Sequence, residues 1–259
     1  MPQTTLLHGD CLDHLQDIPT GSIDAVITDP PFAITACAWD EVIPLEPMWT
    51  ELKRVTKPTA PVVLMAAQPF TSALVMSNLK MFKYEIIWHK TKHSNPFFAG
   101  KRPLPCHESI LVFGRGAITY NPIKEKSPTP YRSNLNTAGR VAKDTVGKQW
   151  AGESELRDAR HPRSVVTIPN PSSEVGLHPT QKPLGLLRYL VQTYTNEGDT
   201  VLDFTMGSGT AGVACVELGR GFVGIERDAT HYQTAQQRLT TALEQPSLFF
   251  NNEGSINHG

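Results

Sequence analysis

The chain has 259 residues, 39% of them hydrophobic, which is enough apolar material for one α/β domain that carries an insert. No apolar run approaches the roughly 20 residues that span a bilayer, and the first residues lack the basic start and apolar run of a signal peptide. The four cysteines contain no C-x-x-C pair, so neither a disulfide framework nor a metal site is expected, and a cytoplasmic location is predicted.

Charge is unevenly distributed along the chain. The net charge is −1, yet residues 80–163 hold 16 Lys and Arg against 7 Asp and Glu. A basic middle third inside an acidic chain is typical of a surface that faces a phosphate backbone. Charge alone is explained equally well by a solvated, variable surface.

Short runs rich in Val and Ile alternate with helical patterns along the chain. Strands are predicted at Thr4–His8, Ile23–Thr28, Pro61–Ala67, Tyr84–His89, Ser109–Phe113, Thr200–Phe204 and Gly221–Glu226. Helices are predicted at Pro44–Thr56, Pro69–Leu79, Leu184–Tyr194, Thr210–Leu218 and Thr230–Leu243. Near-continuous apolar strands between helices predict an α/β fold with a mostly parallel, seven-stranded sheet and helices on both faces. Ligands of such sheets bind beyond the carboxyl ends of the strands.

Residues 120–176 interrupt this alternation. They are rich in Pro, Ser, Asn, Thr, Arg and Lys and show no clear period. A structureless stretch of this length inside a compact domain is either a functional insert or a mobile segment. Residues 1–119 and 177–244 would then be two halves of one domain, and residues 245–259 a flexible tail.

A glycine-containing loop is the first chemical signal. It runs from Asp203 to Thr210, follows a predicted strand and opens a predicted helix. Glycines let a backbone approach a ligand closely, and Glu226 ends the next predicted strand, where an acid about 20 residues beyond such a loop holds a ribose diol. Gly212 completes the G-x-G-x-x-G spacing of a dinucleotide site, but Asp203 would repel a pyrophosphate and suits the charged amino group of an adenosylated amino acid. An ordinary glycine-containing turn is the alternative.

The second signal is Asp29-Pro30-Pro31-Phe32, directly after a predicted strand. The prolines fix two backbone φ angles and remove two donors, which leaves rigid carbonyl acceptors beside the Asp29 carboxylate and the aromatic face of Phe32. Such a turn can accept both N–H bonds of an amino group, favour a tetrahedral nitrogen and stack on a flat ring. Methylation of an exocyclic amine requires this geometry. A rigid strand-to-loop turn without chemistry is the alternative.

Together, Asp29–Phe32 and Asp203–Thr210 resemble the motifs of the amino-group DNA methyltransferases, which act on adenine N6 or cytosine N4. The order, with the catalytic turn before the cofactor loop, resembles the beta arrangement of that family. His178–Pro183 resembles the family's extra cofactor motif, Gly9–Cys11 the segment that holds the adenosine ring, and Ile225–Asp228 the ribose-binding strand end. The resemblance covers most of the chain outside the irregular segment.

The resemblance implies a Rossmann-like methyltransferase fold, S-adenosylmethionine as cofactor, a flipped-out base in double-stranded DNA and a target-recognition insert at 120–176. It places Lys182 near the cofactor's carboxylate. The catalytic residues it implies are Asp29, Pro30, Pro31 and Phe32. The cofactor-binding residues it implies are Asp10, Cys11, Asp29, Lys182, Asp203, Phe204, Gly207, Ser208, Gly209, Thr210, Glu226 and Arg227.

Contacts with DNA are expected from two basic regions. The loop after the strand predicted at Tyr84–His89 starts at the ligand edge of the sheet, and the insert carries several arginines that can contact bases or phosphates. A solvated loop is the alternative for the first region. The predicted DNA-binding residues are Lys90, Lys92, His93, Lys101, Arg102, Arg132, Arg140 and Arg160.

The residue types favour adenine over cytosine as the target. Cytosine-amino enzymes of the family often have Ser where this chain has Asp29, and Phe32 replaces the family's common Tyr, which keeps stacking and loses the hydroxyl. The alternatives are a cytosine N4 methyltransferase, a methyltransferase for an RNA or protein amide amino group, and a non-catalytic DNA-binding module. Intact Asp29, Pro30, Asp203 and Glu226 disfavour the last of these.

Two weaker motifs concern other chemistry and other partners. Pro105-Cys106 resembles the Pro-Cys of cytosine C5 methyltransferases, but it is better interpreted as a strand entry packed in the core. Gln245–Phe249 is similar to the tail motif by which bacterial proteins bind the sliding clamp, although packing on its own domain also explains it. The family resemblance also leaves room for a cognate restriction endonuclease and for a homodimer.

Overall fold

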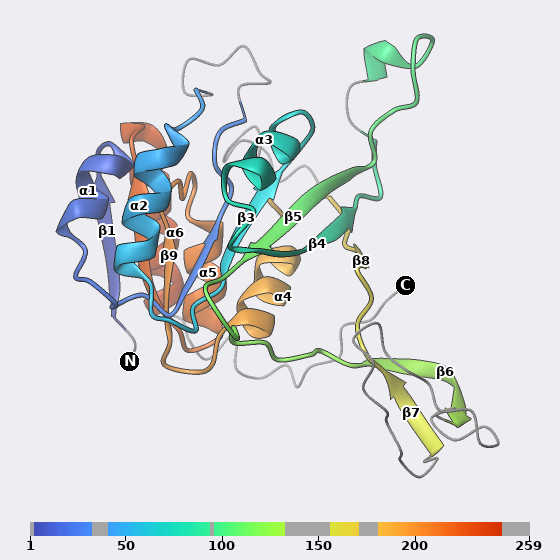
Figure 1. The fold of residues 1–259 in the computed structure, drawn as a ribbon. Coiled ribbons are helices and arrows are strands. Elements are labelled where there is room, and N and C mark those ends of the chain that lie inside the picture. Colours follow the sequence, from blue (N-terminus) through green and yellow to red (C-terminus); the bar gives the residue numbers. More distant parts are fainter. Residues whose placement is uncertain (1–2, 33–40, 94–95, 133–155, 171–180, 245–259) are drawn as a thin grey trace. The chain divides into compact units, whose positions relative to one another are not determined.

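The computed structural model describes residues 3–32, 41–93, 96–132, 156–170 and 181–244 (Figure 1). No helix in these ranges is long and apolar enough to cross a membrane. The chain divides into two compact units. One comprises Met1–Asn121 with Ser164–Gly259, and the other comprises Pro122–Arg163.

The larger unit is built on one eight-stranded sheet with the strand order β1-β10-β9-β2-β3-β5-β4-β8. Its strands are β1 (Thr4–His8), β2 (Ala25–Thr28), β3 (Val62–Ala66), β4 (Phe82–His89), β5 (His107–Phe113), β8 (Val165–Thr167), β9 (Thr200–Asp203) and β10 (Gly221–Glu226). Neighbouring strands are parallel except for β5, which is antiparallel to both β3 and β4. The α/β class and the mostly parallel sheet are thus confirmed. The sheet has one strand more than predicted, because the β-branched segment β8 pairs with β4.

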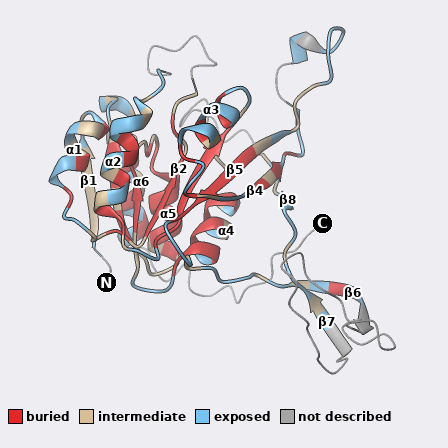
Figure 2. Cartoon of the chain, in the orientation of Figure 1, coloured by how far each residue is buried: buried red, intermediate tan, exposed pale blue. Residues whose placement is uncertain are grey.

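Helices cover both faces of the sheet (Figure 1). They are α1 (Cys11–Asp17), α2 (Leu45–Val55), α3 (Phe70–Ser77), α4 (Leu184–Tyr194), α5 (Thr210–Glu217) and α6 (Ala229–Glu244), with a short 3-10 helix η1 (Pro96–Phe98). Successive strand residues point to opposite faces, so Val26 packs with α1–α3 while Ile27 packs with α4–α6. The buried residues therefore form two layers, one on each side of the strands (Figure 2).

All seven predicted strands and all five predicted helices are present, with ends within two residues of the prediction. Helix α1 was not predicted, although its start carries a capping signal. The side chain of Asp10 accepts a hydrogen bond from the Leu12 N–H at 2.8 Å and so caps the helix. The helix is short, and Arg54 of α2 stabilises its end by donating to the Leu15 carbonyl at 2.6 Å. This helix therefore depends on a tertiary contact.

The smaller unit contains a pair of antiparallel strands, β6 (Glu125–Arg132) and β7 (Leu156–Arg160). Glu125 lies opposite Arg160, and the register shifts between Lys126 and Tyr131. The sequence shows no clear period here, and these two strands were not predicted. Their residues are mostly polar and do not alternate, so they lack the period by which a strand is recognised.

The sheet brings the two chemical signals to the same edge. Strands β2 and β9 are parallel neighbours, and the chain continues from β2 to β3 on one side and from β9 to β10 on the other. Such a reversal of strand order opens a crevice beyond the carboxyl ends. Because β5 runs antiparallel to its neighbours, its first residues lie at this same carboxyl edge.

Packing against β10 explains one glycine of the G-x-G-x-x-G spacing. A Cβ on Gly212 would lie 2.7 Å from Cε1 of Phe222 and 2.8 Å from Cδ2 of Leu239. We expect Gly212→Ala to lower the free energy of unfolding by about 1–3 kcal/mol in urea denaturation, because the close-packed ring must shift. The matched control is Gly185→Ala in α4, where the nearest atom, of Ile168, is 3.7 Å away. The control should be neutral or stabilising by up to about 1 kcal/mol, and equal losses at both sites would contradict the packing argument.

Candidate active site

Threonine hydroxyls join the ends of β2 and β9. The Thr28 hydroxyl donates to Oδ1 of Asp203 at 2.6 Å and lies 2.7 Å from the Thr205 hydroxyl. Thr205 Oγ1 donates to the backbone oxygen of Asp29 at 3.2 Å, and its N–H donates to Asp203 Oδ1 at 3.1 Å. The predicted catalytic turn and the predicted glycine loop are therefore in direct contact.

Two glycines shape the loop between β9 and α5. Gly207 and Gly209 have φ angles of +53° and +76°, which L side chains rarely adopt. A Cβ on Gly209 would also lie 2.9 Å from the Cβ of Ala235 in α6. Glu226 at the end of β10 closes the loop, since its carboxylate accepts from the Gly207 N–H at 2.9 Å and from the Asp228 N–H at 2.7 Å. The loop thus presents backbone groups and an acid beside each other.

Asp203 is a buried acid in this loop, with 6% of its surface exposed. Burial raises the pKa of Asp203 to about 7, the hydrogen bonds from Thr28 and Thr205 oppose the rise, and the charges of Asp29 and Glu226 add to it. A carboxyl group with this pKa gains its full negative charge most readily beside a cation. The loop is therefore suited to a positively charged ligand group.

Several predicted cofactor-binding side chains are engaged in the protein itself. The Phe204 ring is 1% exposed and packs in the core, so its predicted contact with a ligand is wrong for the side chain. Asp10 caps α1, and burial raises the pKa of the Cys11 thiol to about 12, which leaves it unreactive. Arg238 of α6 donates to the backbone oxygen of Ser208 at 2.6 Å.

The other predicted cofactor-binding residues lie at the start of α5, after β10 and before α4. Arg238 also donates to the Thr210 hydroxyl at 3.1 Å, which ties α6 to the start of α5. Arg227 follows β10 and is exposed. Of the His178–Pro183 motif, residues 178–180 lie outside the described part of the chain.

Four charged side chains of alternating sign meet at the carboxyl edge. Lys182, just before α4, bonds Oδ2 of Asp29, and its ammonium lies 3.5 Å from Oε2 of Glu108. Lys90, just after β4, bonds Oε1 of Glu108. The four side chains are 10–24% exposed, so the group is largely removed from water. We call these four residues the charge quartet.

Burial and neighbouring charges act against each other within the quartet. Burial raises the pKa of Asp29, and the Lys182 ammonium opposes that rise. Burial alone would raise the pKa of Glu108 as well, but Lys182 and Lys90 outweigh it and hold the pKa below its ordinary value. Burial lowers the pKa of Lys182, and the charges of Asp29 and Glu108 raise it above its ordinary value. Lys182 therefore stays protonated between two acids.

The quartet corrects one prediction and adds one residue. Lys90 was predicted to contact DNA, but it is 9% exposed and paired with Glu108, so it cannot reach a phosphate without leaving a buried acid unpaired. Glu108 was not predicted at all. It is the second residue of β5 and lies opposite Trp88 of β4. Its position at the carboxyl edge follows only from the antiparallel direction of β5.

The predicted catalytic turn is firmly packed. Pro30 is buried and Pro31 is partly buried. Phe32 stacks on Phe70 with ring centroids 5.5 Å apart, and the Lys182 ammonium lies 5.7 Å from the Phe32 centroid. Oδ1 of Asp29 is buried and has no hydrogen-bond partner among the described residues.

The predicted DNA-binding residues fall into both units. Lys92, His93, Lys101 and Arg102 are exposed in the connection between β4 and β5, and Arg160 is exposed at the end of β7. Arg132 ends β6, and Arg140 lies outside the described residues. Cys106, predicted to be a core residue, is only partly buried.

The connection between β4 and β5 also holds an exposed aromatic residue that was not predicted as a site residue. Phe97 in η1 is 93% exposed.

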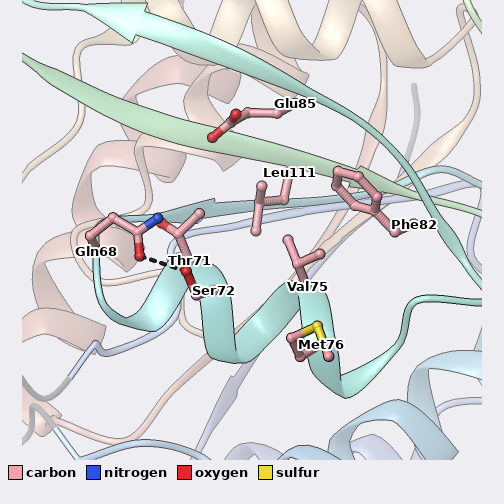
Figure 3. A pocket seen from close by; sticks show the side chains of 8 residues that line it. All are labelled: Gln68, Thr71, Ser72, Val75, Met76, Phe82, Glu85 and Leu111. Atoms are coloured by element: carbon pink, nitrogen blue, oxygen red, sulfur yellow. Dashed lines mark hydrogen bonds between the residues drawn. The ribbon is translucent and has the colours of Figure 1, made fainter.

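A hollow of about 270 Å³ lies apart from these residues, between α3 and the strands β4 and β5. Figure 3 shows the Ser72 hydroxyl of α3 hydrogen-bonded to Gln68, which precedes that helix, with Phe82 and Glu85 of β4 nearby. It contains none of the residues predicted for the site. Its lining has no pair of ionisable groups and no nucleophile beside a base, so it offers no alternative centre for chemistry.

Comparisons with known proteins agree with this geometry. A family model described as DNA methylase, for N6 and N4 methyltransferases, matches residues 23–237. The chain is 26% identical over 271 residues to the type II methyltransferase M.HinfI of Haemophilus influenzae, covering 94% of this chain and 70% of that protein. It is 27% identical over 259 residues to the DNA adenine methyltransferase YhdJ of Escherichia coli K12, covering 92% and 83%.

Solved structures of methyltransferases share the fold of this chain. The complex of M1.HpyAVI with SAM matches with a TM-score of 0.62 and 25% identity, covering 91% of this chain and 98% of that one. The cytosine-N4-specific PvuII DNA methyltransferase shares the fold at 16% identity, with a TM-score of 0.64 over 96% and 95% of the two chains. Since the family model covers most of the chain and its motifs meet at one edge of the sheet, this protein belongs to the DNA methylase family of N6 and N4 methyltransferases.

Proposed function

We propose that this protein transfers a methyl group from S-adenosylmethionine to the N6 amino group of adenine in double-stranded DNA. The observation that carries the proposal is the buried Oδ1 of Asp29, which has no hydrogen-bond partner among the residues that the structure describes and lies in the turn that contacts the glycine loop. A buried acceptor without a donor is costly unless a ligand supplies one. An exocyclic amine supplies such a donor.

The residues of the catalytic turn would act on the amine directly. Asp29 Oδ1 accepts one N–H and the backbone oxygen of Pro30 accepts the other, which draws the nitrogen toward a tetrahedral shape and directs its lone pair out of the ring plane. The nitrogen would bond the methyl carbon as the carbon–sulfur bond breaks and the sulfur leaves as a neutral thioether. The nitrogen would then be cationic, and its surplus proton would pass to Asp29 or to water. Because no covalent bond to the protein forms, the chemistry depends on placement and charge.

The residues of the glycine loop fit the cofactor. The buried Asp203 suits its amino group, Glu226 suits its ribose diol, and the backbone at Gly207 and Gly209 leaves room for close approach. The bound cofactor supplies a methyl group on a positively charged sulfur. The acids of this edge therefore favour the charged cofactor.

Adenine is the favoured base for two reasons. Asp29 is the residue type that the family's adenine enzymes favour, and YhdJ is named a DNA adenine methyltransferase. The cytosine-N4 enzyme from the comparison shares the fold alone at 16% identity. Cytosine N4 is the second candidate, because its amino group offers the same two N–H bonds.

The DNA would be bound by exposed basic side chains of both units. In the connection 90–106, Lys92, Lys101 and Arg102 are exposed, and this stretch contains no acid. In the smaller unit, Arg160 lies on a strand pair whose sequence is also basic. The target base would be flipped out of the duplex, because an amine inside a stack cannot reach Asp29.

The other partners stay predictions. The tail motif Gln245–Phe249 lies outside the described residues, so its binding to a sliding clamp rests on its sequence. A cognate restriction endonuclease, a homodimer, a target-recognition role for the insert and a cytoplasmic location rest on the family resemblance and on composition.

Replacing the unpartnered acceptor tests the proposed reaction. We expect Asp29→Ala to slow transfer of tritium from labelled cofactor to duplex DNA by at least about 100-fold, because one preorganised polar contact is lost. Cofactor binding in calorimetry should stay measurable. Asp17→Ala is the control, since Asp17 is 82% exposed in α1. Digestion of wild-type product should yield N6-methyladenine. An unchanged rate in Asp29→Ala contradicts the proposal, and N4-methylcytosine in the digest selects the second candidate.

The raised pKa of Asp203 predicts a pH dependence of cofactor binding. The free protein holds a proton on Asp203 below about pH 7, whereas pairing with the cofactor's amino group requires the ionised form. The affinity should therefore rise about fivefold to tenfold between pH 6 and pH 7.5 and then level off. Asp203→Asn keeps an oxygen for the donors Thr28 and Thr205, and it should bind weakly with a flat profile. The same slope in both proteins would rule out Asp203 as the titrating group.

The exposed ring of Phe97 predicts a role in opening the duplex. An apolar side chain among cations can insert between base steps and take the place of a flipped base. We expect Phe97→Ala to slow methylation of paired adenine at least tenfold and to recover most of the rate when the target lies opposite an abasic site. Leu79→Ala, 56% exposed elsewhere, is the control. A loss that the abasic substrate does not repair would point to a different role for Phe97.

A further inference from the structure

We propose that Lys90, Glu108 and Lys182 are positioning residues that act through Asp29. The two lysines favour the ionised form of its carboxylate, Glu108 holds Lys182 in place, and Lys182 leaves Oδ1 of Asp29 for the amine. The proposal rests on the proposed function, in which Asp29 accepts an N–H of the target base. It goes beyond that function because it assigns Lys182 to the acid and not to the cofactor's carboxylate.

Geometry gives each member of the quartet one task. Lys182 bonds Oδ2 of Asp29, which leaves Oδ1 as the oxygen without a partner among the described residues. The ammonium of Lys182 thus decides which oxygen faces the ligand. Its own position is set from the other side by Glu108, whose Oε2 is 3.5 Å away, and Glu108 is held by Lys90.

The charges of the quartet alternate in sign and balance one another. The two acids and the two lysines are formally neutral together, and they come from four separate places, after β2, after β4, in β5 and before α4. Removing charged groups from water is costly and seldom adds stability. This buried ionic group ends on an acid whose Oδ1 has no partner in the described part of the chain, and that is better explained by chemistry than by folding.

Ionisation of Asp29 depends on this arrangement. A protonated carboxyl group would be a donor and could not accept both a proton from the product and an N–H from the substrate. Burial favours the protonated form of Asp29, Glu108 adds to that tendency, and Lys182 and Lys90 oppose it. Asp203 at the end of β9 is a further charged neighbour among the described residues, and its own pKa is raised by the charge of Asp29.

The sign of each charge gives two opposite predictions. Without the positive charge of Lys182, the pKa of Asp29 rises. In a profile of single-turnover rate against pH, the limb on which the rate increases with pH (the acid limb) therefore moves to higher pH. We expect Lys182→Met to shift this limb up by at least about one pH unit, which costs about tenfold in rate on that limb, with recovery at high pH. Glu108→Gln removes a negative neighbour and should shift the limb to lower pH or leave it in place. A merely structural role would lower the rate without moving the limb.

A control variant and a binding measurement accompany this test. Lys182→Arg keeps the charge and should keep the limb within about 0.3 pH units of the wild type. Cofactor affinity is measured alongside, and Lys182→Met should stay within about threefold of the wild type in calorimetry. A Lys182→Met protein that loses affinity by tenfold or more, with an unmoved limb, would overturn the proposal and place Lys182 at the cofactor's carboxylate.

A readout without turnover separates this proposal from the proposed function. Protein labelled with ¹³C at the aspartate carboxyl carbon is titrated by NMR, and the Asp29 signal is assigned by its absence in Asp29→Asn. The titration midpoint should rise by at least about one unit in Lys182→Met and fall or stay constant in Glu108→Gln. Equal midpoints in wild type and Lys182→Met would sink the proposal. Lack of DNA methylation by the wild type would instead remove the proposed function while leaving these midpoints interpretable.

Discussion

The hydroxyl of Thr205 lies 2.7 Å from the hydroxyl of Thr28 and 3.2 Å from the carbonyl oxygen of Asp29, and this contact joins the two strands that lead into the proposed site. The contact exists because β2 and β9 are parallel neighbours whose carboxyl ends reach the same edge. Everything else at the site depends on that pairing. A carboxylate that accepts from an amine is useful only if the methyl donor is held beside it, and Asp29 and Asp203 are 174 positions apart in the sequence.

The acids at this edge of the sheet are stabilised differently on the side of the glycine loop and on the side of the Asp29 turn. Asp203 and Glu226 lie on the loop side, where hydrogen bonds from hydroxyl and backbone donors stabilise them. Asp29 and Glu108 lie on the turn side, where lysines stabilise them. The loop side is left acidic, which suits a cationic cofactor. The turn side is formally neutral, which suits an uncharged amino group.

The rigid and the adaptable parts of the protein serve different tasks. The proposed catalytic turn and the glycine loop extend from strands with buried residues on both faces, so their geometry is held by the core. The exposed basic and aromatic residues of the connection between β4 and β5 lie on a loop, where a surface can vary without disturbing the sheet. The strand pair of the smaller unit is likewise polar. DNA recognition in this proposal is therefore placed on elements whose sequence the core does not constrain.

The site could be predicted from the sequence where local chemistry and spacing were informative, and less well where partners came from distant strands. Asp29–Phe32 and Asp203–Thr210 were recognised from their sequence, because proline and glycine predict particular backbone conformations and each stretch places an acid beside them. Phe204, in the middle of the second stretch, was assigned to the cofactor, although its ring fills the core. A sequence shows that a residue is near a loop and does not show which way its side chain points.

By itself, the sequence determined the fold class, the seven strands and five helices, and the two chemical motifs, because apolar periodicity and turn chemistry are local properties of the chain. Only the tertiary structure decided that β5 runs against its neighbours, that Glu108 thereby reaches the carboxyl edge, and that Lys90 is buried against it and not exposed. It also decided that Lys182 bonds Asp29. Strand direction and charge pairing depend on residues far apart in the chain, and no local pattern in the sequence records them.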